Sequence, residues 1–127
     1  MATDIEGARD QARAQLDSIM GMVEASRRGG QDNRNTAIVR ILEGPLSIEV
    51  RSGWHQLEDE DTKASEYMLL LCPGRPTVRI TGDLDEYQQP TTVKLQYQDW
   101  GTPWELYRTT KEEDDALLTY ARYFFGQ

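Results

Sequence analysis

The side chains that most often perform catalysis are scarce in this chain of 127 residues, which has one histidine, His55, and one cysteine, Cys72. No serine or cysteine lies in the strand-to-helix turn that typically exposes a nucleophile. We interpret His55 as a hydrogen-bonded residue at a loop edge, beside a partly buried Trp54. Cys72 ends the apolar run 67–71, which favours a packed core thiol over a reactive one. We therefore expect no enzyme activity and no catalytic residue.

Carboxylates are abundant, since 22 residues are Asp or Glu, but their abundance gives no specific signal. Nothing in their spacing singles out a pair for general acid–base catalysis. A lone histidine and a lone cysteine do not form a zinc site, and no acidic run has the spacing of a calcium-binding loop with its central glycine. The glycines do not form a phosphate-binding loop that opens a helix. We predict no bound metal and no cofactor.

Two groups of side chains are candidates for binding a partner, and the first is acidic. Carboxylates arranged in rows could take the place of nucleic-acid phosphates against a basic surface. A further acidic stretch over 112–115 fits this idea, but it also fits the ordinary preference of acids for a helix N-terminus. The acidic candidates are Glu58, Asp59, Glu60, Asp61, Asp83, Asp85 and Glu86.

The second group is aromatic and comprises the three tryptophans, Trp54, Trp100 and Trp104, together with Tyr97 and Tyr107. Two of the tryptophans flank a sharp break at Gly101 and Pro103, where the proline restricts the backbone. Tryptophans at such rigid turns either close a small core or anchor a partner. We consider closure of the core the main role of Trp100 and Trp104 and a partner contact the alternative.

Helical periodicity appears first at the N-terminus. Apolar residues recur at three- and four-residue steps over 4–28, which predicts a long amphipathic helix. A polar linker is expected over 29–35. Thr36 can then cap a short helix over 37–43, although a strand is also possible there. Residues 36–127 are expected to form the core of a single domain.

Strands are expected over 46–51, 66–72, 77–81 and 91–98, and all of these except 66–72 alternate with the period of a strand. Residues 66–72 are almost wholly apolar, which predicts a central strand covered on both faces. Short connections favour an antiparallel meander. Thr110 and Glu113 form the signature of a capping box, which predicts a helix that continues to Phe125.

The sequence therefore predicts an α+β fold in two layers. A long N-terminal helix, a short helix, a four-stranded antiparallel β-meander and a C-terminal helix follow one another along the chain. The amphipathic helices must cover one face of the sheet, because they are the available apolar surfaces.

The net charge of −8 lies mostly in the second part of the chain, since residues 56–127 carry −7. A nucleic-acid-binding protein would show clustered lysine and arginine instead, so direct binding of DNA or RNA is disfavoured. No apolar run is long enough for a membrane span. A single cysteine excludes an internal disulfide, and we expect a cytoplasmic protein.

Three blocks of sequence carry a resemblance, namely Leu46–His55, Tyr97–Trp104 and Leu117–Gly126. In their order and composition they resemble a group of small proteins encoded by bacteriophages, prophages and integrated mobile elements. The resemblance covers about residues 36–127 and carries over no catalytic residue. It implies a mobile-element context inside a bacterial host, in which small acidic proteins often counter host defences.

Our leading hypothesis is an anti-defence protein that resembles an anti-CRISPR. It would bind a host nuclease or surveillance complex, a Cas effector above all, and block it without catalysis. Acidic mimicry of nucleic acid is one mechanism for such a block. One alternative is a phage accessory or regulatory module that binds a protein unrelated to defence. Another is a sponge for a signalling nucleotide, which predicts a pocket with Arg51, Arg79 or Arg108 beside an aromatic ring.

Overall fold

A computed structural model of the chain describes residues 5–28, 30–54, 56–58, 63–72, 76–99 and 101–125. Within these residues the chain forms three helices and five strands. All the strands join one antiparallel sheet in the order β1-β2-β3-β4-β5, which confirms the α+β class and the meander. The elements are α1 (Ile5–Arg28), α2 (Gln31–Leu42), β1 (Ser47–Arg51), β2 (Glu66–Cys72), β3 (Thr77–Asp83), β4 (Lys94–Gln98), β5 (Glu105–Tyr107) and α3 (Lys111–Arg122).

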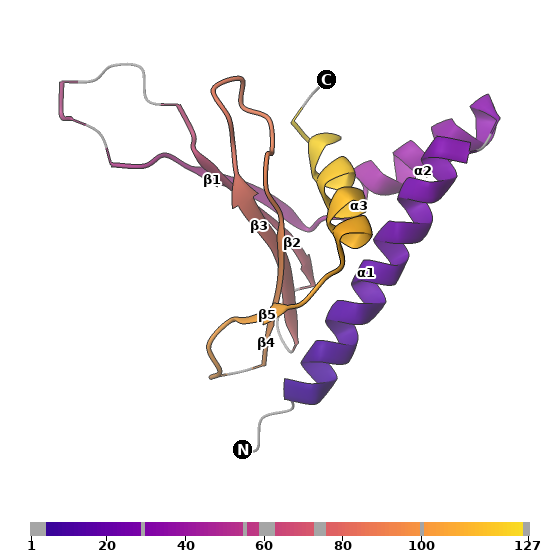
Figure 1. The fold of residues 1–127 in the computed structure, drawn as a ribbon, viewed down its shortest axis with the longest axis horizontal. Coiled ribbons are helices and arrows are strands. Elements are labelled where there is room, and N and C mark those ends of the chain that lie inside the picture. Colours follow the sequence, from indigo (N-terminus) through magenta and orange to yellow (C-terminus); the bar gives the residue numbers. More distant parts are fainter. Residues whose placement is uncertain are drawn as a thin grey trace.

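The helices lie together on one side of the sheet, and none of the described helices covers its other face (Figure 1). Alternate side chains of the central strands point toward the helices and bury their apolar surface, which is the main stabilising contribution to the fold. The core therefore lies between the sheet and the helices α1 and α3. Its fully buried large side chains include Leu16, Ile19, Leu69, Ile80, Leu95, Leu117 and Tyr120.

Helix α1 begins and ends close to the predicted bounds, and its apolar stripe is buried as expected. The second helix differs from the prediction, because it begins at Gln31 and includes most of the expected linker. Gly30 precedes it without a side-chain cap. The segment 31–35 is polar and has no periodically spaced apolar residues, so its sequence predicts a loop. The packing of α2 along α1 and the bond from Arg34 Nε to the carbonyl of Ser26 (3.1 Å) help to hold it as a helix.

A fifth strand corrects the predicted four-stranded sheet. Residues Glu105–Tyr107 form β5 and pair with β4, so that Tyr107 lies opposite Leu95. The chain reverses after β4 through Gly101, whose φ of 78° is a left-handed conformation that suits glycine. Three residues are too few to show a period-two pattern, so residues 105–107 carry no recognisable strand pattern.

Strand β2 has the predicted bounds but is covered on one face instead of two. Tyr67, Leu69 and Leu71 are buried against the helices, whereas the residues between them are half-buried on the open face. Strand β1 lies at the edge of the sheet. Its Ile48 and Val50 share the helix side with Leu69 and Tyr67, yet they are 45% and 53% exposed because the helices do not reach that edge.

Helix α3 begins with the predicted capping box. The Thr110 hydroxyl accepts a hydrogen bond from the Glu113 amide (3.1 Å), and the Glu113 carboxylate accepts one from the Thr110 amide (2.9 Å). The helix ends at Arg122, and residues 123–125 continue as turns that bring Phe125 against Tyr67.

Candidate functional site

The predicted partner-binding residues separate into three places in the structure. Trp54 and Glu58 lie in the loop between β1 and β2, the acids 83–86 lie at the end of β3 and in the loop that follows, and Trp104 precedes β5. Several other candidates lie outside the described residues, so the structure does not place them. These are Asp59, Glu60, Asp61 and Trp100, and His55 also lies outside the described residues.

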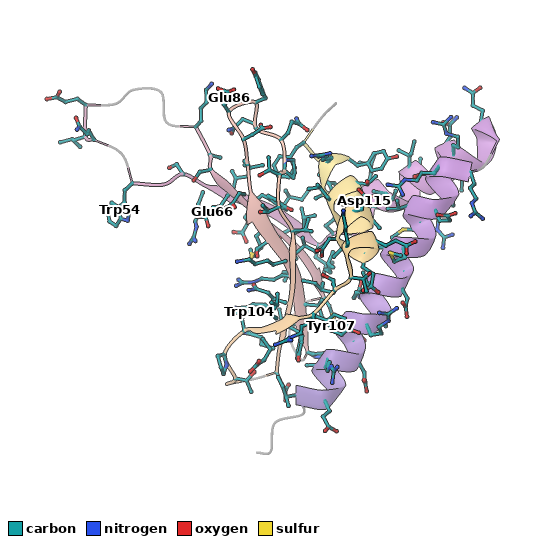
Figure 2. The ribbon with its side chains drawn as sticks, viewed as in Figure 1. Trp54, Glu66, Glu86, Trp104, Tyr107 and Asp115 are labelled. Carbon is teal, nitrogen blue, oxygen red and sulfur yellow. The ribbon has the colours of Figure 1, made fainter. Side chains whose placement is uncertain are left out.

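The loop between β1 and β2 exposes large apolar side chains. Trp54 has a relative accessibility of 106% and Leu57 one of 100%, so both side chains are fully exposed to solvent. Figure 2 shows Trp54 at the end of the molecule that lies away from the helices. We expected a partly buried tryptophan beside His55, so full exposure corrects that expectation. A tryptophan contributes nothing to the core from this position.

The loop between β3 and β4 lies beside the base of this exposed loop. The side-chain amide of Gln88 donates to the carbonyl of Ala64 (2.8 Å), and the backbone amide of Leu84 donates to the carbonyl of Ser65 (2.8 Å). Tyr87 on this second loop is 76% exposed. Aromatic side chains from both loops are thus presented at the same end of the sheet.

The acids of this end have different roles. Asp85 accepts hydrogen bonds from the amides of Tyr87 (2.8 Å) and Gln89 (3.0 Å), so it shapes its own loop. Asp83 accepts from the Thr92 hydroxyl (3.2 Å). In the described part of the chain, Glu58 and Glu86 form no ion pair and are exposed. They are the described acids of this end that remain available to a partner.

The acidic stretch 112–115 does not join that end of the molecule. The Glu113 carboxylate is an ion-pair partner of Arg13 (2.8 Å), and Asp115 pairs with Arg27 at 3.4 Å. Hydrogen bonds from Thr110 and Arg13 hold the pKa of Glu113 below its usual value. Figure 2 shows Asp115 on α3, in the helix layer and away from Trp54. These acids fix α3 to α1, which agrees with the helix N-terminal alternative.

The open face of the sheet contains a hollow of about 460 Å³. On its β3 side the guanidinium carbon of Arg79 lies 3.7 Å from the centroid of the Trp104 ring, which is a close cation–π contact. Arg79 Nε also donates to the side-chain oxygen of Gln96 (2.8 Å). Burial, with a smaller contribution from the like charge of Arg51, lowers the pKa of Arg79.

The charges of the hollow are arranged unevenly. Arg51 forms a two-point pair with Glu66 (2.6 and 3.1 Å), which lowers the pKa of that carboxyl group and raises that of the guanidinium. In the described residues, neither Arg79 nor Lys94 forms an ion pair with a carboxylate. The uncompensated cations therefore lie on β3 and β4.

Sequence reasoning identified part of this arrangement. Arg51 and Arg79 line the hollow as the nucleotide-binding alternative requires, whereas Arg108 is not among its lining residues. The contact of Arg79 with Trp104 was missed, because it depends on β5 and on the turn that brings the tryptophan back across the sheet. Alternation in β3 and β4 could have placed Arg79 and Gln96 on one face, since they are direct partners in the register.

Other kinds of site find little support in the described part of the chain. It holds no cluster of three or more metal-ligating side chains. The Cys72 thiol is half-buried and donates to the carbonyl of Pro76 (3.3 Å). None of the described helices combines the length and apolar character needed to cross a membrane.

Comparison with known proteins adds no family. The chain matches no protein-family model, no curated protein and no solved structure.

Proposed function

We propose that this chain is a non-enzymatic binding protein that contacts a partner protein through the loop between β1 and β2. The observation that carries this proposal is the complete exposure of Trp54 and Leu57. A loop that served only to connect two strands would have no need for a tryptophan and a leucine at its surface. Here the two exposed apolar side chains are three residues apart in the same loop, and Figure 2 shows Trp54 on a part of it that projects away from the sheet.

The energetics favour this loop as an anchor. A tryptophan side chain buries roughly 150–250 Å² when it enters a pocket, and at about 25 cal/mol per Å² this contributes several kcal/mol to binding. Tryptophan is also enriched among the few residues that dominate measured interfaces. Exposed Glu58 on the same loop, and exposed Glu86 on the neighbouring loop at the same end of the sheet, favour a partner with a basic rim, because complementary charges accelerate association.

The resemblance to mobile-element proteins supplies the biological context of this proposal. In that context the partner is a host nuclease or surveillance complex, and the protein blocks it as an anti-CRISPR would. The pairing of Glu113 with Arg13 and of Asp115 with Arg27 leaves fewer carboxylates for mimicry of nucleic acid. We therefore favour insertion of the Trp54 loop over a broad acidic mimic as the mechanism.

The alternative of an accessory module unrelated to defence has its own supporting observation. Edge strand β1 exposes Ile48 and Val50, so an apolar surface remains uncovered while the acids are dispersed. Both functions use protein binding, and they differ in the identity of the partner. A phage-protection assay separates them.

The experiment is capture of partners from a bacterial host that carries a CRISPR system, using the tagged chain, together with plaque assays. We expect Trp54→Ala combined with Leu57→Ala to reduce capture by at least about tenfold, as loss of an interface anchor does. Leu106→Ala is the matched control, because Leu106 is 54% exposed on β5 at a different place. Equal capture by wild type and the double variant would refute the role of the loop. Capture without protection of phage would favour the accessory module.

A further inference from the structure

The open face of the sheet has a second feature that protein binding through the Trp54 loop does not explain. We propose that its hollow is a binding site for a nucleotide, with the phosphate held by Arg79 and Lys94 on strands β3 and β4. This site lies on a different surface from the proposed protein contact. The two inferences therefore succeed or fail independently.

The register of the sheet brings the relevant side chains together. Arg79 pairs with Gln96 across β3 and β4, and Thr81 pairs with Lys94. Residues two apart on a strand share a face, so these four side chains form one rectangle on the open side of the sheet. Its members supply cationic and neutral polar groups, the kinds of group that bind phosphate oxygens. All four line the hollow.

Arg79 is held in place, but no carboxylate of the described residues compensates its charge. The Trp104 ring lies against one side of its guanidinium, Gln96 holds Nε, and among the described residues Nη1 donates to the weak acceptor Met68 Sδ at 3.7 Å. Arginine has five N–H donors in a rigid plane, and such a plane binds a phosphate through two parallel hydrogen bonds. A guanidinium fixed in this way loses little side-chain entropy when an anion binds. An anionic group of a ligand would supply the counter-charge that Arg79 lacks among the described residues.

The acids of the hollow define the other end of the ligand. Glu49 lies on β1, Glu66 on β2 and Asp83 at the end of β3, so they surround the side opposite to the Arg79–Gln96 pair. Glu66 is paired with Arg51 and Asp83 accepts from Thr92, but a carboxylate has further lone pairs. These acids therefore repel a phosphate and can still accept hydrogen bonds from amino and hydroxyl groups. A nucleotide carries both chemistries, with an anionic phosphate at one end and a ribose and an aminated base at the other. The volume of about 460 Å³ lies within the range of small-molecule sites.

Calorimetric titration of the full chain with AMP tests this assignment, with adenosine and inorganic phosphate as separate titrants. We expect AMP to bind more tightly than either, because only AMP reaches both ends of the hollow. Adenosine binding as tightly as AMP would overturn the role of the cations. Phosphate binding as tightly as AMP would overturn the role of the acidic end and leave an anion site only. No heat and no change of amide resonances with millimolar AMP would overturn the site.

Substitutions of two arginines test whether AMP binds at this site or responds only to the net charge of the protein. Arg79→Gln should weaken AMP binding by about tenfold or more, since hydrogen bonds to charged groups are among the strong ones. Arg40→Gln, on helix α2, changes the net charge equally but lies in the other layer, so it should bind AMP as wild type does. Trp104→Phe keeps an aromatic face for Arg79 and should retain most of the affinity. Near-ultraviolet circular dichroism verifies folding, and equal affinity of folded Arg79→Gln and wild type would refute the proposal.

Discussion

The two faces of the sheet are built from the same alternating strands but differ in what covers them. On the helix side, Leu69 and Ile80 are fully buried beneath α1 and α3. On the other side, Leu70 and Arg79 occupy neighbouring positions and remain partly exposed. The first face holds the fold together, whereas the second is restrained by polar contacts and remains open to a ligand. Whether helices cover a face of the sheet, more than the residue composition of that face, therefore decides whether it stabilises the fold or stays open to a ligand.

Two tryptophans repeat this contrast on the uncovered surfaces. Trp104 lies against Arg79 and is half-buried, while Trp54 is fully exposed on the loop between β1 and β2. A restrained aromatic ring orients a neighbouring charge, and an exposed one offers its own surface to a partner. The same residue type thus has two different roles, which substitutions can tell apart.

The largest expected difference in the free energy of unfolding is between alanine substitutions of two adjacent leucines of β2, Leu69 and Leu70. Leu69→Ala removes a fully buried side chain and should lower the free energy of unfolding by about 3 kcal/mol, through lost burial and a residual cavity. Leu70→Ala changes the same atoms on the open face and should cost about 1 kcal/mol. Urea denaturation with a common m-value measures both. Equal losses would mean that another molecule covers the open face, which a dependence on protein concentration would reveal.

The covered face could largely be predicted from the sequence. The three- and four-residue steps of α1, the capping box at Thr110 and the alternation in β3 depend on local spacing, and the structure confirms each of them. The full extent of α2 and the presence of β5 could not be predicted in the same way. The start of α2 is polar and held by α1, and β5 is held by pairing with β4, so both depend on contacts with distant segments.

The candidate sites were predictable only in part for the same reason. Trp54 was a candidate from its residue type, but its complete exposure depends on how far the loop extends from the sheet. Arg79 was a candidate as a cation in a strand. Its contact with Trp104 requires the chain to reverse at Gly101 and return across the sheet. Sequence spacing identifies such residues, and the tertiary fold decides which of them meet.

Two glycines lie in contrasting surroundings, since Gly82 is on β3 beside Tyr67 and Gly53 is in the exposed loop between β1 and β2. A β-carbon at Gly82 would collide with the Thr92 carbonyl and lie 2.7 Å from the Tyr67 ring, whose hydroxyl donates to the same carbonyl. Gly82→Ala should therefore cost about 2 kcal/mol of stability. Gly53→Ala, beside Trp54, would place its β-carbon 3.6 Å from Ser65 Oγ and should change stability by less than about 0.5 kcal/mol. Thermal unfolding measures both, and a stable Gly82→Ala would show that Thr92 can move away.

The carboxylate of Glu113 joins helix α3 to helix α1 through its ion pair with Arg13. The pKa of Glu113 is lowered in the folded protein, so its contribution to stability is present above the unfolded pKa near 4.5 and is lost as pH falls through the folded value. Glu113→Gln should cost about 1 kcal/mol at pH 7, and the difference from wild type should vanish in acid. Glu112→Gln is the control, since Glu112 is exposed in the same turn. A difference that persists unchanged at pH 3 would contradict the ionic origin.

The smallest expected difference in the free energy of unfolding is between alanine substitutions of the two tryptophans, Trp104 and Trp54. Trp104→Ala loses the contact with Arg79 and should cost about 1 kcal/mol, whereas Trp54→Ala loses no intramolecular packing and should stay within about 0.5 kcal/mol of wild type. Guanidinium denaturation measures both. Partner capture should show the reverse order, because Trp54 supplies the contact surface. A loss of stability in Trp54→Ala equal to that in Trp104→Ala would mean that the loop packs on the domain in solution, and the exposed anchor would then lose its physical basis.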